Sequence, residues 1–167
     1  FVAEALRDRG HTVRQVFTSD DRDPLRKLPR KLADSDGNIV GLGEVDAGAL
    51  GRNLGKPYTD IPDPFGERDS YAAHFAALLK ADAERLGVDI ELEPELYGKG
   101  AFDPVVERVL DRVDTAREVL SEYQAKADDE YVPFNPICEA CGKLTETVTD
   151  IDLAAETVDY VCTDMAV

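Results

Sequence analysis

The chain has 167 residues, which is enough for one domain or for one domain with a small insert. Its formal net charge is −16, from 35 acidic and 19 basic residues, and a charge of this sign disfavours nucleic-acid binding, which depends on neutralising phosphates. The longest apolar runs are far too short to cross a bilayer, which excludes a membrane-spanning helix.

The acidic residues are spread over the whole chain and are not collected in a tail. This distribution favours a protein adapted to concentrated salt, in which the self-repulsion of the charges is screened. An ordinary acidic protein, or an acidic part of a more balanced chain, is the alternative. In concentrated salt the acidic balance would no longer argue against a nucleic-acid partner.

The first elements are predicted to be a helix and a strand. Residues 1–9 have the composition of a helix, and Gly10 follows as its stop. Residues 11–17 carry β-branched and aromatic side chains and are predicted to form a strand. The strand ends at Asp20 and Asp21. Because ligands gather outside the carboxyl ends of strands in open α/β sheets, binding chemistry is expected there.

The next part of the chain is predicted to be a long loop followed by a helix. Residues 33–57 are rich in glycine and aspartate, which is typical of a long loop or an insert. Asp69 or Ser70 is expected to cap the following helix, and Gly87 to end it. The apolar stripe of this helix consists of Tyr71, Phe75, Leu78, Leu79 and Leu86.

Strand and helix then alternate once more. Residues 88–92 alternate between apolar and acidic side chains and predict a strand. Asp103, followed by proline, is expected to open a third helix, whose apolar stripe continues to Tyr123. This alternation predicts an α/β fold for residues 1–125.

The composition changes after residue 125. Residues 126–130 are polar and predict a linker to a second, smaller unit. Two segments rich in threonine and valine, 144–151 and 156–161, predict a β-hairpin that returns the chain to Cys162.

Three cysteines are the candidate metal ligands. Cys138 and Cys141 form a Cys-x-x-Cys turn with Gly142 behind it, and Cys162 lies 21 positions after Cys141. A structural zinc site uses four such ligands in a tetrahedron, and a hairpin can return the second pair to the first. A redox dithiol or plain buried cysteines are the alternatives.

The acidic strand end and a basic cluster are the candidate binding groups. Asp20 or Asp21 could hold a substrate ammonium group by a charge-assisted hydrogen bond, although a solvated turn is the alternative in so acidic a chain. Phosphate contact and a solvated charged face are equally consistent with the densest basic cluster, which consists of Arg26, Lys27, Arg30 and Lys31.

Tyr71 and His74 lie in the first turns of the second predicted helix. His74 is one of only two histidines, and a lone histidine is more often a packing residue than a base. Both residues are kept as candidates for substrate binding. No order of residues typical of nucleophilic catalysis is present.

Five short strings in one order give the chain its resemblance to a known family. They are residues 19–29, 61–66 (Ile-Pro-Asp-Pro-Phe-Gly), 70–75 (Ser-Tyr-Ala-Ala-His-Phe), 95–97 (Glu-Leu-Tyr) and the cysteine turn at 138–141. Together they resemble the class I lysyl-tRNA synthetases of the archaeal type, here with the composition of a halophile. The resemblance covers nearly the whole chain.

The resemblance implies a fold and a set of site residues. Residues 1–125 would be part of a Rossmann-like catalytic core, and residues 126–167 a truncated zinc-binding insert with a small zinc-ribbon-like β structure. The fourth zinc ligand would lie just past Val167. Asp20 and Asp21 would lie next to the amino acid and the terminal adenosine of tRNA.

The resemblance also implies an activity, which is the activation of L-lysine with ATP and Mg²⁺ and its transfer to tRNA(Lys) in the cytoplasm. The HIGH-like and KMSKS-like motifs of the family are not found in the chain, so the chain alone is expected to be inactive. A glutamyl- or glutaminyl-type class I synthetase and a non-enzymatic zinc-ribbon binding module are the alternatives.

Overall fold

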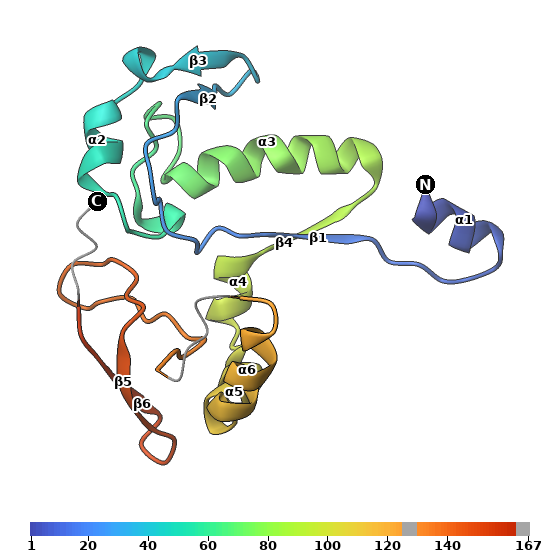
Figure 1. Ribbon diagram of the computed structural model, residues 1–167. Coiled ribbons are helices and arrows are strands. Elements are labelled where there is room, and N and C mark those ends of the chain that lie inside the picture. The colour runs from blue at the N-terminus through green and yellow to red at the C-terminus, as the bar shows by residue number, and fades with distance from the viewer. Residues whose placement is uncertain (125–129, 163–167) are drawn as a thin grey trace.

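A computed structural model describes residues 1–124 and 130–162 (Figure 1). The elements in chain order are α1 (Val2–Asp8), β1 (Val16–Ser19), β2 (Lys31–Ala33), β3 (Ile39–Gly41), a 3-10 turn (Leu42–Glu44), α2 (Ala47–Arg52), a second 3-10 turn (Tyr58–Asp60), α3 (Tyr71–Leu86), β4 (Asp89–Leu92), α4 (Glu93–Gly98), α5 (Asp103–Asp111), α6 (Val113–Ser121), β5 (Val148–Asp152) and β6 (Thr157–Tyr160).

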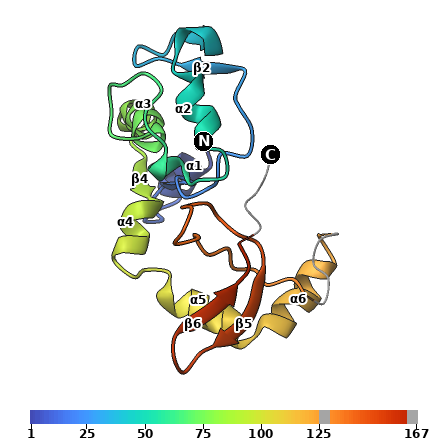
Figure 2. The same cartoon turned by 90° about the vertical axis from the view of Figure 1, so that its left-hand side faces the viewer.

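Within the described residues, the strands form three two-stranded sheets. β1 and β4 are parallel, whereas β2–β3 and β5–β6 are antiparallel hairpins. Both views place β5–β6 and α5–α6 in the half of the molecule away from α2 and α3 (Figures 1 and 2). Mixed helices and strands agree with the expected α/β class. The predicted linker falls mostly on residues 125–129, which lie outside the described residues.

The parallel pair β1–β4 sets the geometry of the strand ends. Ser19 pairs with Leu92 at the end of the register, so the next residues along each strand, Asp20 and Glu93, emerge at the same edge. The first strand begins at Val16 and not at the predicted His11. The reason is that a strand exists only where a neighbour pairs with it, and β4 has only four residues.

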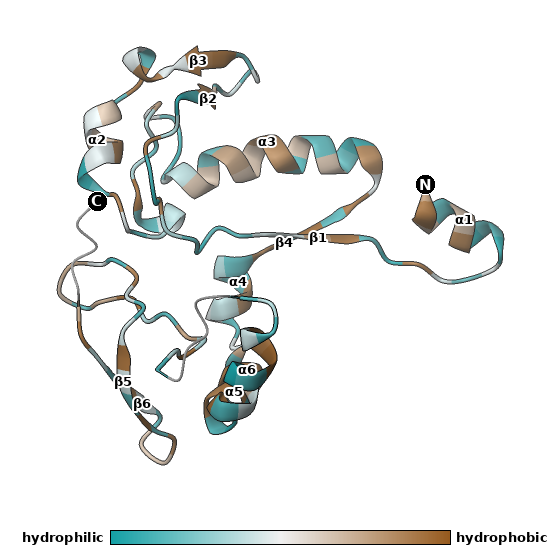
Figure 3. Ribbon diagram, in the orientation of Figure 1, coloured by the Kyte–Doolittle hydropathy of each residue, from teal (hydrophilic) through white to brown (hydrophobic). Residues whose placement is uncertain are grey.

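The residues described leave β1 partly uncovered on both faces of this parallel pair, since the consecutive residues Val16 and Phe17 point to opposite faces and both are exposed. The apolar residues of β1 are visible in Figure 3, and the side chains of Val16 and Phe17 are 40% and 49% exposed. Parallel sheets in α/β proteins are normally buried on both faces. No helix within the described residues is both long enough and apolar enough to span a membrane.

The prediction of a long loop over residues 33–57 is wrong. This segment contains the end of the β2–β3 hairpin, a 3-10 turn and α2. The side chain of Asp46 caps α2 by accepting from the N–H of Ala49 at 2.8 Å. Leu50 of α2 is fully buried and forms the core with Leu25, Leu32 and Ile61. Tertiary burial therefore stabilises elements that are too short to show a sequence period.

Helix α3 is confirmed at both ends. The hydroxyl of Ser70 accepts from the N–H of Ala73 at 3.1 Å, and Gly87 ends the helix in the left-handed conformation with φ +63°. β4 follows as predicted. The helix predicted to begin at Asp103 does begin there. It is not one helix but two, α5 and α6, separated at Arg112.

The loop that leads into α3 is built around the buried carboxylate of Asp63, whose side chain is fully enclosed. Its two oxygens accept from three backbone N–H groups, those of Phe65 at 3.1 Å, Glu67 at 2.9 Å and Arg68 at 2.8 Å. A buried carboxylate is stable only when it is hydrogen-bonded in this way. The string at residues 61–66 is therefore a structural loop.

The cysteine-rich part folds as a turn and a hairpin. Ile137 and Leu144 form an antiparallel bridge that closes the cysteine turn, and β5–β6 confirms the predicted hairpin. The N–H of Leu144 donates to the carbonyl of Gly55 at 3.0 Å. This hydrogen bond joins the cysteine-rich part directly to the segment after α2.

Candidate substrate and metal sites

The acidic turn that follows β1 is the first candidate site. Asp20 is exposed and Asp21 is half-buried. The hydroxyl of Ser19 donates to Asp21 Oδ2 at 2.6 Å, and the N–H of Asp23 donates to the carbonyl of Asp20 at 3.3 Å. The sequence therefore locates these carboxylates correctly at a strand end, and the structure holds them in a tight turn.

Glu93, which the sequence analysis did not single out, belongs to the same cluster. It follows β4, and its Oε2 accepts from the N–H of Arg22 at 3.2 Å. Burial raises the pKa of Glu93 above its ordinary value, the Arg22 hydrogen bond opposes this, and the charges of Asp20, Asp23 and Asp21 raise it further. The rule that drew attention to Asp20, position at a strand end, would also have found Glu93.

Arg22, whose backbone N–H bonds to Glu93, also contacts an aromatic ring with its side chain. Its guanidinium lies 5.4 Å from the centre of the Tyr97 ring of α4, a cation–π geometry. Tyr97 in turn packs against Phe102 with ring centres 4.7 Å apart. The string at residues 95–97 thus supports the acidic turn from the side of α4.

Tyr71 is linked to the acidic turn by a second tyrosine, Tyr58, which contacts both. The rings of Tyr58 and Tyr71 stack with centres 5.2 Å apart, and the N–H of Tyr58 donates to the carbonyl of Asp23 at 3.0 Å. Burial raises the pKa of both tyrosines. The charge of Asp23 raises the pKa of Tyr58 further, whereas Arg26 lowers it. Tyr58 is a second residue that the sequence analysis missed.

His74 is a packing residue in the structure. Its side chain is 1% exposed, its Nε2 lies 2.9 Å from the carbonyl oxygen of Ala33, and its Nδ1 lies 3.4 Å from Asp63 Oδ1. The ring also stacks on Phe65, with centres 4.5 Å apart. Because a carbonyl only accepts, Nε2 carries a proton. His74 thus ties α3 to the β2–β3 hairpin and to the Asp63 loop, and its role in substrate binding stays a prediction.

The basic cluster is exposed along the segment that leads into β2. Arg26 forms an ion pair with Glu146 of the cysteine-rich part, with Nη1 and Oε1 3.2 Å apart. One of its members is therefore engaged in joining the two parts of the chain. The other exposed members are Lys27, Arg30 and Lys31.

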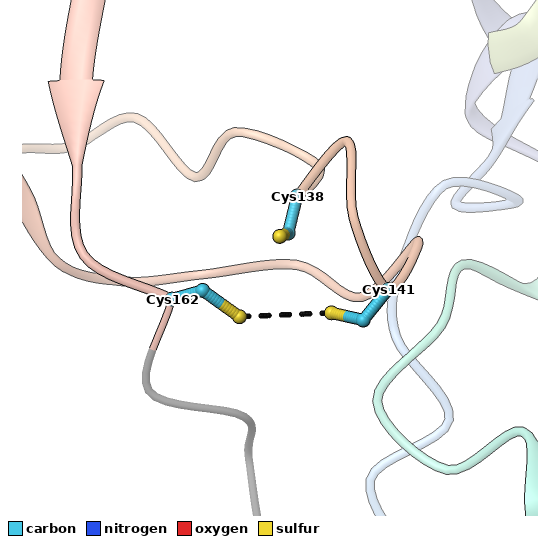
Figure 4. A group of neighbouring side chains, drawn as sticks. All are labelled: Cys138, Cys141 and Cys162. Atoms are coloured by element: carbon cyan, nitrogen blue, oxygen red, sulfur yellow. Dashed lines mark hydrogen bonds between the residues drawn. The ribbon is translucent and has the colours of Figure 1, made fainter.

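The three cysteines come together as the sequence predicts. Each sulfur lies within 4.8 Å of the other two, and those of Cys141 and Cys162 are 3.6 Å apart (Figure 4). Cys138 and Cys141 come from one turn, and Cys162 from the chain that leaves β6. Thiolates at about 2.3 Å from a tetrahedral zinc lie about 3.8 Å apart, so these three positions fit three corners of such a site.

The surroundings of Cys138 favour a thiolate. The pKa of Cys138 is lowered to about 7, because the backbone N–H groups of Cys141 and Ala140 donate to its sulfur and Cys162 adds a side-chain hydrogen bond. The hydroxyl of Tyr160 accepts from the N–H of Glu139 at 3.1 Å, which holds β6 against the turn. The turn lies before a hairpin and not between a strand and a helix, so the context expected of a redox dithiol is not met.

Comparison with known sequences gives the class of the protein. Residues 1–166 match the pattern of the family described as "tRNA synthetases class I (K)". Since this match covers nearly the whole chain, the chain belongs to that family of class I tRNA synthetases. The resemblance found in the five strings is thereby confirmed.

The relatives are lysine–tRNA ligases. The enzyme of Halobacterium salinarum is 67% identical over 167 residues, which cover 99% of this chain and 30% of the relative. That of Natronomonas pharaonis is 70% identical over 99% of this chain and 31% of its own length. A lysine–tRNA ligase of Methanosarcina acetivorans is 35% identical over 95% of this chain and 28% of its own length. The chain thus spans about 30% of the length of the relatives from Halobacterium and Natronomonas.

Proposed function

We propose that the chain is part of a lysine–tRNA ligase, which activates L-lysine with ATP to lysyl-adenylate and transfers the lysyl group to tRNA(Lys). The observation that carries this proposal is the identity of 67% to 70% with relatives of that name over 99% of the chain. The chain matches only part of those relatives, so the activity is proposed for the full-length protein. Translation would place the protein in the cytoplasm.

The acidic turn would bind the amino acid. Lysine carries two ammonium groups, and Asp20, Asp21 and Glu93 offer carboxylates at the ends of two adjacent parallel strands. A charge-assisted hydrogen bond from an ammonium group to such a carboxylate is stronger than a neutral one. Placing the ammonium there would orient the lysine carboxylate for in-line attack on the α-phosphate of ATP. Tyr71 and Tyr58 would line the same side.

Positioning would be the main contribution of these residues to the reaction. Holding two reactants in line lowers the barrier without any covalent chemistry by the protein. ATP with its Mg²⁺ would bind largely to residues outside this chain, among them the HIGH-like and KMSKS-like motifs. Basic side chains could contact phosphates of ATP or of the tRNA acceptor end; these are Arg26, Lys27, Arg30 and Lys31.

The cysteine cluster would hold a structural zinc ion. Cys138, Cys141 and Cys162 supply three thiolates, and the fourth ligand would come from outside the described residues. Zinc held by four such ligands has no open position for a substrate, and its contribution is to the folding of the turn and the hairpin. Residues 1–125 would belong to a Rossmann-like core. The exposure of β1 on both faces supports this, since the remainder of such a core would cover it.

Aminoacylation by the full-length protein in concentrated KCl tests this proposal. Wild type is expected to charge tRNA(Lys) with lysine, and Asp20→Asn and Asp21→Asn to raise the KM for lysine by about tenfold. Asp36→Asn, in the exposed turn between β2 and β3, is the matched control and should leave the KM unchanged. Charging with glutamate or glutamine would assign the protein to that branch of class I. No charging with any of them would favour a binding module.

A further inference from the structure

The cysteine-rich part and the acidic turn are both attached to one short segment, residues 55–58. On one side of this segment, the N–H of Gly55 donates to the carbonyl of Leu25 at 2.9 Å and the N–H of Leu25 donates to the carbonyl of Lys56 at 2.9 Å. The hydrogen bond from Tyr58 to Asp23 and the bridge between Pro24 and Pro57 complete this ladder. It anchors the residues that directly follow Asp20 and Asp21.

The other side of the same segment carries the cysteine turn. The carbonyl of Gly55 accepts from the N–H of Leu144, and the carbonyl of Lys143, the residue before it, accepts from the N–H of Cys138 at 2.8 Å. The N–H of Gly55 therefore bonds to Leu25, just after the acidic turn, and its carbonyl bonds to Leu144, just after the cysteine turn.

Two glycines and two lysines interlock at this contact. A Cβ on Gly55 would lie 3.1 Å from Lys143 Cδ, and a Cβ on Gly142 would lie 3.6 Å from Lys56 Cε. The side chain of Lys143, which follows Gly142, thus packs over Gly55. The side chain of Lys56, which follows Gly55, packs over Gly142. Gly55 and Gly142 both have positive φ, +86° and +73°, a conformation that favours glycine. The contact is closely packed and tolerates little added volume.

The positive charge of a lysine at this contact lies near the cysteine turn, where thiolates would be negatively charged. The Lys56 stem lies over Gly142, the neighbour of Cys141, and a Cβ there would be 4.0 Å from Lys56 Nζ. Three thiolates and one Zn²⁺ have a net charge of about −1 before the fourth ligand is counted, which an adjacent ammonium group stabilises. The lysine stem that packs over the glycine therefore also favours the loaded site.

We propose that Gly55, Lys56, Gly142 and Lys143 form a coupling interlock that makes the position of the acidic turn depend on metal at the cysteine cluster. The inference rests on the proposed metal site and adds a role for it. Metal binding orders the cysteine turn, the ordered turn holds the segment 55–58, and this segment holds Asp23 and Leu25. By reciprocity, the factor by which bound metal favours the closed interlock is also the factor by which the closed interlock favours metal binding, so a change that loosens the interlock weakens metal binding.

Hydrogen exchange of the full-length protein, with zinc bound and after chelation, tests the coupling. Removal of zinc is expected to speed exchange of the Leu25, Gly55 and Tyr58 amides by about fivefold or more, since each closes a hydrogen bond at the interlock or the ladder. The His74 amide inside α3 should not change. Faster exchange confined to Cys138 and Gly142 would overturn the coupling and leave the metal site intact.

A matched pair of glycine variants tests the interlock itself, with zinc affinity measured by competition with a chromogenic chelator. Gly55→Ala adds a Cβ at 3.1 Å from Lys143, whereas Gly37→Ala, at nearly the same φ of +83°, has nothing within 4 Å. Gly55→Ala is expected to weaken zinc binding about fivefold or more relative to Gly37→Ala. In the double variant with Lys143→Ala, the side-chain atoms closest to the new Cβ are gone, and part of the affinity should return.

The outcomes separate this inference from the proposed function. Equal zinc affinity in Gly55→Ala and Gly37→Ala would overturn the interlock. Wild-type protein that binds no zinc would overturn both the interlock and the metal site, but not lysine activation, which aminoacylation measures independently. If Gly55→Ala does not fold, the exchange experiment on the wild type still decides the question.

Discussion

Asp63→Asn tests whether the buried carboxylate organises the loop before α3. An asparagine has one oxygen, so it keeps at most the two bonds that Oδ2 accepts from the N–H groups of Glu67 and Arg68, and it turns an NH₂ group toward the N–H of Phe65. Losing one bond to a charged acceptor costs about 1.5–3 kcal/mol. The two remaining bonds lose their charge assistance, which is about half of their strength.

His74 reduces this cost in part. Its Nδ1 lies 3.4 Å from Asp63 Oδ1 and could accept a hydrogen bond from the new amide, which would recover about 1 kcal/mol. The net destabilisation of the loop and of its contact with α3 is then about 2–5 kcal/mol. Hydrogen exchange of the first α3 amides in molar KCl should therefore be about 30-fold faster or more in Asp63→Asn than in wild type.

Asp60→Asn is the control for this experiment. It makes the same change of charge three residues earlier, at an exposed carboxylate that accepts from the hydroxyl of Thr59. Its effect should stay within about 0.5 kcal/mol. Equal exchange rates in the two variants would refute the claim that the Asp63 carboxylate, and not the overall charge, holds the loop together.

Four further predictions concern the two sites and the net charge. Glu93→Gln should raise the KM for lysine about fivefold, whereas Glu95→Gln, on the exposed side of α4, should not. Because the folded-state pKa of Glu93 is raised, ionisation of this group opposes folding. The free energy of unfolding should therefore fall as the pH rises from the ordinary glutamate range through the raised pKa. Urea titrations at several pH values should show this fall in wild type and not in Glu93→Gln. Cys138→Ser should lower bound zinc, measured by elemental analysis, well below one per chain, and Ser121→Ala should not. Lowering KCl from 1 M to 0.1 M lengthens the screening distance from about 3 Å to about 10 Å, so the melting temperature should drop by several degrees; an unchanged value would contradict salt adaptation.

The parts of the fold that the sequence predicts are those with local signals. Helix α3 has a capping serine, an apolar stripe and a terminal glycine, and the structure has all three. The Cys-x-x-Cys turn and the β5–β6 hairpin likewise depend on residues close in sequence. In these segments the physical cause of the structure lies within the segment itself.

The parts that the sequence does not predict depend on distant residues. Leu50 makes α2 part of the core only because Leu25, Leu32 and Ile61 close around it, so residues 33–57 look like a loop when taken alone. The stripe from Asp103 to Tyr123 predicts one helix, and the structure breaks it at Arg112 without a helix-breaking residue.

The candidate sites follow the same pattern. Glu93 joins Asp20 only through the parallel register of β1 and β4, and the ion pair between Arg26 and Glu146 spans 120 positions of sequence. A histidine in a sequence suggests catalysis or binding, but the surroundings of His74 are known only from the fold. Its enclosure by Asp63 and Ala33 depends on two loops that carry no periodic signal.

ATP–pyrophosphate exchange by the full-length protein in molar KCl tests the central claim most directly, with lysine, glutamate and glutamine in parallel. The account predicts exchange with lysine alone, strongly reduced in Asp20→Asn and undetectable for the isolated 167-residue chain. Exchange with glutamate or glutamine, or with none of the three even when tRNA is added, would contradict it.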